Sequence, residues 1–240
     1  MNGSFLTANW RHLVFLNYEA DRALVQPHVP EGTELDLLGG KSIVSVVAFR
    51  FLDARLLGVP IPFHRDFDEI NLRAYVRRRV KGVWRRGVVF VRELVPRPAI
   101  AWTARLAYNE PYRAVRMRHT VALDDARGGS ARYEWRQAGN WHHVASEAIG
   151  APQPIDPESD TGFVTEHYFG YTRQRNGGTV EYRVEHPRWR VWPAHRPEFH
   201  CDVSAVYGPA WSECLQAPPF SAFVCDGAPV SISFPSMLHR

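Results

Sequence analysis

With 240 residues, 45% of them hydrophobic and 22% charged, the chain has the balance of a globular protein. No apolar run approaches the roughly 20 residues of a membrane helix, and the N-terminus lacks the basic-then-apolar form of a signal peptide. The sequence therefore predicts a cytoplasmic protein with no membrane partner. The three cysteines, at positions 201, 214 and 225, are odd in number and near one end, which argues against a disulfide framework.

The net charge of +4 comes almost entirely from arginine, because Lys41 and Lys81 are the only lysines. The densest basic cluster, residues 77–86, contains five arginines on both sides of Lys81 and Gly82, a pattern typical of a hairpin tip. This cluster is either a solvated tip or a phosphate-binding patch. No nucleic-acid-binding motif accompanies it, so a nucleic-acid partner is not expected.

The first part of the chain reads as strands joined by short turns. Residues 10–18 (WRHLVFLNY) predict a strand with apolar residues on both faces, and Asp21 can cap a short helix over 22–26. Further strands are expected at 34–38 and 42–52.

Residues 69–79 alternate in character, as expected of a strand with two different faces. One face carries Ile70, Leu72, Ala74 and Val76. The other carries Glu69, Asn71, Arg73, Tyr75 and Arg77. The polar face lies either in water or along a cavity, and alternation alone cannot separate these interpretations.

The stretch 87–117 is the centre of the prediction. Its apolar run 88–91 indicates a strand covered on both faces, and Arg92 and Glu93 then point to opposite faces. Prolines follow, and 99–108 shows a helical pattern that Pro111 ends before a next strand at 112–117. Such a strand–helix–strand unit can hold polar residues beside an apolar cavity.

The second half again predicts mostly strands. Strands are expected at 118–124, 131–136, 141–149, 163–172, 180–184, 189–192, 222–225 and 230–234, with 207–215 helical. The proline-containing segment 151–160 is the one plausible linker, but it is short and strand-rich sequence continues on both sides of it. Residues 1–240 are therefore predicted to form one domain. The fold class is mainly β (α+β), barrel-like, with two or three short helices.

Motifs for common chemistries are absent. There is no phosphate-binding loop, no dinucleotide-binding glycine motif, no HExxH and no Gly-x-Ser-x-Gly, so neither a cofactor nor a metal is expected. Glu166-His167-Tyr168 is read on a strand, with His167 on the face opposite its neighbours. His167 is then either a satisfied core histidine or a catalytic one. His186, near Trp189, leaves the same choice, and both regions could instead line the mouth of a barrel.

Several segments together resemble the uncharacterised bacterial DUF2071 family within the acetoacetate decarboxylase-like superfamily. They are FLTANWRHLVFLNYEAD, VPEGTELD, FHRDFDEINLRAYVR, RGVVFVRELVPRPAI, ARLAYNEPY, TEHYFGY and HPRW. The resemblance implies a β-barrel or cone with a mostly apolar internal cavity in which small keto acids are handled. Arg11 is similar to the decarboxylases' cavity arginine, and Glu69 to a cavity carboxylate. Arg97 stands where those enzymes carry a second cavity glutamate.

The sequence departs from the decarboxylases at the residue that defines their chemistry. Those enzymes carry a lysine pair after a proline, and the first lysine forms a Schiff base with the substrate ketone. Here Pro111 is followed by Tyr112 and Arg113. Neither tyrosine nor a guanidinium can form an imine, so Schiff-base decarboxylation is not expected.

Two functions are compatible with these patterns. In the first, the barrel binds a small anionic keto or hydroxy acid, with Glu69 and Tyr112 as proton-transfer groups. The ligand-binding residues would be Arg11, Arg73, Glu93 and Arg97. In the second, arginines and glutamates form a structural network in a non-catalytic scaffold or interaction module. Whether the chain forms a homo-oligomer is left open.

Overall fold

The computed structural model describes residues 4–99, 109–137, 139–175 and 177–238. Within these ranges the protein is mainly β, which confirms the predicted fold class. Most of the helix expected over 99–108 lies outside the described residues.

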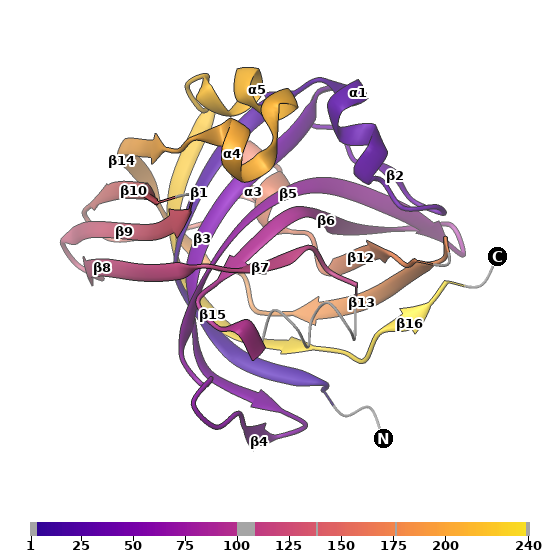
Figure 1. Ribbon diagram of the computed structural model, residues 1–240, viewed down its shortest axis with the longest axis horizontal. Helices are drawn as coiled ribbons and strands as arrows, with labels where there is room; N and C mark the ends of the chain where they lie inside the picture. Colours follow the sequence, from indigo (N-terminus) through magenta and orange to yellow (C-terminus); the bar gives the residue numbers. More distant parts are fainter. Residues whose placement is uncertain (1–3, 100–108, 138, 176, 239–240) are drawn as a thin grey trace.

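Seven strands form a closed ring (Figure 1). In order of pairing they are β13 (Thr179–Glu185), β12 (Phe169–Arg173), β6 (Val83–Val95), β5 (Phe67–Val80), β3 (Ser42–Leu56), β1 (Leu6–Ala20) and β15 (Ser221–Ile232). The ring closes because the end of β15 pairs with the end of β13, Ile232 opposite Val184.

A second group of long strands extends the ring on one side, at the left of Figure 1. It consists of β14 (Arg190–His200), β10 (Asn140–Ile149), β9 (Gly128–Gln137) and β8 (Arg116–Asp124). β14 pairs with the first half of β15, so β15 belongs to both groups. Short strands complete the sheet: β2 (Glu34–Leu35), β4 (Val59–Pro60), β7 (Tyr112–Ala114), β11 (Gln153–Pro154) and β16 (Ser236–Met237).

The described helices are short. They are α1 (Arg22–Val25), α3 (Asp160–Thr165), α4 (Val203–Tyr207) and α5 (Ser212–Gln216), with single 3-10 turns at Gln26–His28 and Pro209–Trp211. As predicted, Asp21 caps α1, because its side chain accepts from the Ala23 backbone N–H at 2.8 Å. None of the helices within the described ranges is long and apolar enough to span a membrane.

The prediction of a strand over 163–172 is wrong in its first part. Residues 160–165 form α3, because the Ser159 side chain caps the helix by accepting from the Gly162 N–H at 3.1 Å. A Cβ on Gly162 would lie 2.5 Å from the carbonyl oxygens of Asp156 and Pro157, so only glycine fits this turn. The strand β12 begins only at Phe169.

Glycine also permits the ring to close at β6. Gly87 pairs with Phe169 of β12 in parallel register, and a Cβ there would lie 2.6 Å from the Phe169 carbonyl oxygen. A larger residue would therefore push β12 away from β6.

The arginine cluster is confirmed as a hairpin tip, with Lys81 and Gly82 at φ 48° and 85° between β5 and β6. Its flanking arginines pair with acidic residues from other strands and loops. These ion pairs are Arg77–Glu34 (2.7 Å), Arg86–Asp36 (2.6 Å), and Arg78 and Arg85 with Glu181. Four of the five arginines in the cluster are thus paired within the protein, by three carboxylates.

Candidate functional site

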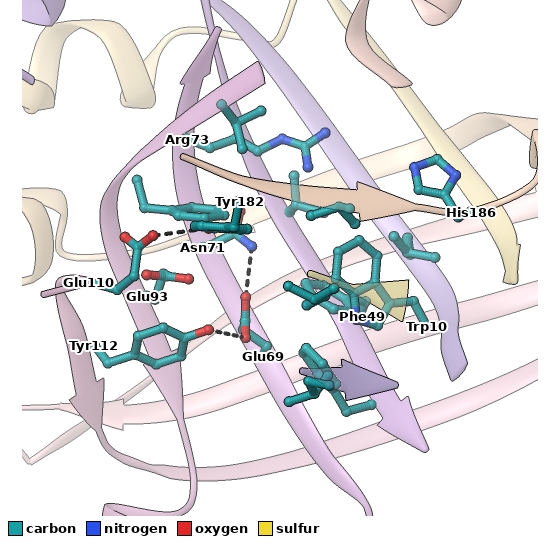
Figure 2. A pocket seen from close by; sticks show the side chains of 18 of the residues that line it. Trp10, Phe49, Glu69, Asn71, Arg73, Glu93, Glu110, Tyr112, Tyr182 and His186 are labelled. Atoms are coloured by element: carbon teal, nitrogen blue, oxygen red, sulfur yellow. Dashed lines mark hydrogen bonds between the residues drawn. The ribbon is translucent and has the colours of Figure 1, made fainter. Parts of the chain in front are cut away.

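The ring of strands encloses a cavity of about 250 Å³ (Figure 2). This volume lies just below the ~300–1,000 Å³ typical of small-molecule sites. One end of the cavity is polar, with three glutamates and a tyrosine, and the other end is aromatic.

Strand β5 supplies the polar wall. Glu69, Asn71 and Arg73 line the cavity, while the other face of the strand is fully buried in the main apolar core. The structure therefore agrees with the second interpretation of the alternating pattern, in which the polar face follows a cavity. Period-two alternation places these three side chains in one row.

Three buried carboxyl groups meet at the polar end. Glu69 of β5, Glu93 of β6 and Glu110 are 3%, 1% and 6% exposed. The Tyr112 hydroxyl donates to Glu69 Oε2 at 3.0 Å, and Asn71 Nδ2 donates to Glu69 Oε1 at 3.0 Å. Figure 2 shows these groups gathered on one side of the cavity. The cluster can hold and exchange protons in an environment largely closed to water.

The backbone before β7 brings Glu110 and Tyr112 to the cluster. Tyr112 lies beside Glu93 in the parallel β6–β7 pair, and its N–H donates to the Glu110 carbonyl at 2.9 Å. Glu110 Oε1 in turn accepts from the Tyr182 hydroxyl at 2.9 Å and from the Thr172 hydroxyl. Strands β12 and β13 thus hold Glu110 against the cavity wall.

Burial raises the pKa of each carboxyl group. Desolvation raises the pKa of Glu69 to about 7, against the hydrogen bonds from Asn71 and Tyr112, and raises that of Glu110 to about 7 as well. The pKa of Glu93 lies well above its usual range because of burial and the nearby charges of Glu110 and Glu69. Because all three pKa values are raised, the cluster retains protons near neutral pH.

Arg73 is the cation of the cavity wall. Its side chain is 9% exposed, Nη2 donates to the Val164 carbonyl at 3.2 Å, and Nε donates to the Tyr75 hydroxyl at 3.3 Å. Its guanidinium also lies 4.9 Å from the centre of the Phe15 ring. Among the described residues it forms no ion pair, although a buried cation is costly without one.

The far end of the cavity is aromatic. The Trp10 and Phe49 ring centres are 5.2 Å apart, those of Phe49 and Phe51 are 5.3 Å apart, and Phe51 stacks on Phe67 at 4.5 Å. In Figure 2, Trp10 and Phe49 lie to the right of Glu69, and Tyr112, Glu93 and Glu110 lie to its left. This half offers ring contacts and apolar surface.

Four of the six predicted site residues meet at this cavity: Glu69, Arg73, Glu93 and Tyr112. Arg11 does not line it. Its neighbour Trp10 faces the cavity, so Arg11 points to the other face of β1, where Nη1 donates to the Gly227 carbonyl at 3.5 Å. Arg97 is exposed just beyond the end of β6. The structure therefore separates these two arginines from the other four residues.

Three further residues of the cluster, Glu110, Tyr182 and Thr172, were not predicted from the sequence. Glu110 lies in the NEP segment before β7, and an acidic residue directly preceding the proline that ends a predicted helix was its only local signal. Tyr182 and Thr172 lie on β13 and β12 and gave no signal of their own, because their contact with Glu110 depends on ring closure.

His167 lines the cavity, but on the short link between α3 and β12 rather than on a strand as predicted. Its Nε2 lies 3.1 Å from Asp36 Oδ2, and burial lowers its pKa to about 4. His186 also lines the cavity and stacks on Trp189 with ring centres 4.3 Å apart. A neutral His167 adds polarity to the wall without adding positive charge.

Both lysines of the chain lie among the described residues, and neither lines the cavity. Lys41 pairs with Glu19 at the surface, and Lys81 is at the hairpin tip. A Schiff base therefore has no lysine in this cavity to form on. No group of three metal-ligating side chains with suitable geometry occurs in the described part of the chain.

The ring of strands, its enclosed cavity and the buried carboxyl cluster define a class of mainly β protein with an internal cavity of small-molecule size. Residues 7–229 match the model of the family DUF2071, described as an uncharacterized conserved protein. The chain belongs to this family, which confirms the resemblance found in the sequence. The uncharacterized protein YqjF of Bacillus subtilis (strain 168) is 28% identical over 198 residues, covering 82% of this chain and 78% of YqjF.

Solved structures share the fold at low sequence identity. An acetoacetate decarboxylase-like enzyme from Sphingomonas wittichii RW1 superposes with a TM-score of 0.67 at 11% identity, covering 99% of this chain and 94% of that one. The enduracididine biosynthesis enzyme MppR complexed with pyruvate gives a TM-score of 0.62 at 10% identity, covering 98% and 90%. At these identities the likeness shows the fold alone.

Proposed function

We propose that the cavity binds a small keto or hydroxy acid and that its carboxyl–phenol cluster moves protons on the bound acid. The observation that carries the proposal is Arg73, a buried guanidinium that forms no ion pair with any described residue and lies on the same strand face as Glu69. An anionic ligand would supply the partner that Arg73 lacks.

The state of the carboxyl groups is compatible with an anionic ligand. Their raised pKa values leave the cluster partly protonated near neutral pH, so it does not simply repel a carboxylate. A glutamate that titrates near pH 7 is suited to both accepting and donating a proton. Glu69 would act as the acid–base group beside the ligand's carbonyl or hydroxyl, and Tyr112 would hold Glu69 through its hydrogen bond.

The reaction supported by this arrangement is proton transfer at the carbon next to a carbonyl, or at its oxygen. Two proteins of this fold, one named as an acetoacetate decarboxylase-like enzyme and one solved with pyruvate, lend support to a keto acid as the ligand. The cavity has no lysine for imine chemistry. We therefore assign acid–base chemistry without a covalent intermediate.

A thermal-shift screen against keto, hydroxy and dicarboxylic acids tests the proposal, using wild type, Arg73→Gln and Arg11→Gln. Arg11→Gln is the matched control, because Arg11 lies outside the cavity. We expect an acid to raise the melting temperature of wild type and Arg11→Gln but not of Arg73→Gln. A stabilisation that survives in Arg73→Gln would contradict the assignment of Arg73.

The rival function is a non-catalytic scaffold in which the arginines and glutamates form a structural network. Arg73 makes no ion pair with the glutamates of the cavity, and the hairpin arginines pair with acidic residues elsewhere. If no acid shifts the wild type while Arg73→Gln lowers its melting temperature, the scaffold is favoured.

A further inference from the structure

We propose that the acid bound here carries an aromatic group, and an oxygen next to its carboxylate, rather than being a two- or three-carbon acid. The inference rests on the proposed function and names its substrate class: aryl-substituted hydroxy acids and enolisable aryl keto acids. The aryl group would lie against Phe49 and Phe51, with the acid head between Arg73 and the carboxyl cluster.

The register of two neighbouring strands places the polar and aromatic halves side by side. Along the inward face of β5 the order is Arg73, Asn71, Glu69 and Phe67. On β3, Val47 lies opposite Asn71, Phe49 opposite Glu69 and Phe51 opposite Phe67. Directly opposed side chains lie about 5 Å apart at Cβ. If the reacting carbon of the ligand lies at Glu69, a substituent on the neighbouring carbon would therefore contact Phe49.

The aromatic half of the cavity is long enough for an aryl group on the ligand and longer than a methyl group needs. Phe67 lies two residues beyond Glu69, about 7 Å along the strand. Phe51 stacks on Phe67 with an interplanar angle of 12°, and Trp10 meets Phe49 edge-on at 61°. A ring bound here would join an existing set of ring contacts. A three-carbon acid would leave that surface without a partner.

The polar end indicates what the head of the ligand carries. Glu93 Oε2 and Asn71 Oδ1 are buried without a hydrogen-bond partner among the described residues, and the two side chains are 1% and 2% exposed. Buried polar atoms of this kind are rarely left unpaired. A hydroxyl or enol oxygen next to the carboxylate would give them a partner while the carboxylate meets Arg73.

Calorimetric titration with matched acids tests this class. The probes are lactate and 3-phenyllactate, pyruvate and phenylpyruvate, and 3-phenylpropionate, which has the ring and the carboxylate but lacks the oxygen between them. We expect each aryl acid to bind at least about tenfold more tightly than its small counterpart, as apolar groups of this size discriminate in a pocket. Phenyllactate should also bind more tightly than 3-phenylpropionate.

Two substitutions test where the aryl group of the ligand binds. Phe49→Leu and Phe51→Leu should each reduce the preference for the aryl acid by about threefold or more while lactate binding persists. Phe223→Leu is the matched control, since Phe223 is a buried phenylalanine outside the cavity. It should leave the preference unchanged. An undiminished preference in both cavity variants would overturn the placement.

The outcomes separate the two proposals. Equal or weaker binding of the aryl acids, with binding of lactate or pyruvate retained, overturns the inference and leaves the proposed function intact. Equal binding of phenyllactate and 3-phenylpropionate overturns the requirement for the oxygen. If none of the five acids binds wild type, both the inference and the proposed function are overturned.

Discussion

Four side chains on the cavity wall carry the chemistry proposed for this protein: Glu69, Glu93, Glu110 and Tyr112. Glu69 and Glu93 lie on two ring strands and Glu110 precedes β7, yet the charge of Glu69 raises the pKa of both other carboxyl groups. Arg73 lies on the same strand face and forms no ion pair in the described part of the chain. Substitutions at Tyr112 and Glu69 distinguish a group that transfers a proton from a group that only positions a neighbouring side chain.

Tyr112→Phe tests the hydrogen bond that holds Glu69, the proposed proton-transfer group. The change removes the hydroxyl that donates to Glu69 at 3.0 Å without emptying the cavity. We expect ligand affinity to change little, while hydrogen–deuterium exchange at the carbon beside the ligand's carbonyl, followed by NMR, slows by about 10²-fold or more. An unchanged exchange rate would remove Tyr112 from the mechanism.

Glu69→Gln changes the pH dependence of stability. The folded pKa of about 7 is above the ordinary 4.5, so Glu69 stabilises the fold fully below pH 4.5 and loses this contribution as pH rises through 7. The unfolding free energy of Glu69→Gln relative to wild type should therefore rise between pH 4.5 and 8 by about 3 kcal/mol, since a tenfold change in proton affinity is worth about 1.4 kcal/mol.

Denaturant titrations at several pH values provide this measurement. Glu158→Gln is the control, because Glu158 is exposed and does not line the cavity. It should follow wild type at every pH. If the unfolding free energy of Glu69→Gln depends on pH in the same way as that of wild type, folding does not raise the pKa of Glu69.

Residue patterns and the family resemblance predicted Glu69, Glu93, Arg73 and Tyr112, which all line the cavity, but not Glu110. Arg11 was expected in the cavity because of the family resemblance, but Trp10 beside it faces inward, and a β-bulge follows with His12 at φ 56°. Glu110 could not be found by periodicity, because it lies outside regular structure. Both residues lie at or beside irregular backbone, and the periodicity of a sequence does not predict where irregular backbone occurs.

At the scale of elements, β5 separates the core from the cavity. The prediction from alternation named both faces correctly, since the apolar set lies in the main core and Glu69, Asn71 and Arg73 line the cavity. Alternation cannot say what covers the polar face. That depends on ring closure between β13 and β15, which pairs Val184 with Ile232 and Glu185 with Ser231, residues 48 and 46 positions apart in sequence.

Substitutions at two adjacent residues of β5 test whether its two faces differ in their contribution to stability. Leu72→Ala should lower the unfolding free energy by about 2–5 kcal/mol, because Leu72 is fully buried in the core. Asn71→Ala should cost only about 1 kcal/mol, the net value of one hydrogen bond, because its side chain faces a cavity. Urea denaturation gives both values. Equal costs would contradict the division of faces.

At the scale of the whole molecule, much of the basic charge at the hairpin tip is paired with acidic residues of the same chain. Arg77, Arg78, Arg85 and Arg86 all pair with Glu34, Asp36 or Glu181. We expect no binding of a labelled single-stranded oligonucleotide at about 0.15 M salt by fluorescence anisotropy. Binding that weakens steeply with salt and is lost in Arg78→Gln would contradict this expectation.

The central claim is that Arg73 and the carboxyl cluster hold the two ends of one acid's head group. The most direct test is a crystal structure of the protein grown with 3-phenyllactate. We expect the ligand's carboxylate within hydrogen-bonding distance of Arg73 and its hydroxyl within the same distance of Glu93 or Asn71. A ligand bound outside the ring, or Arg73 paired with Glu69 in a cavity that holds only water, would contradict it.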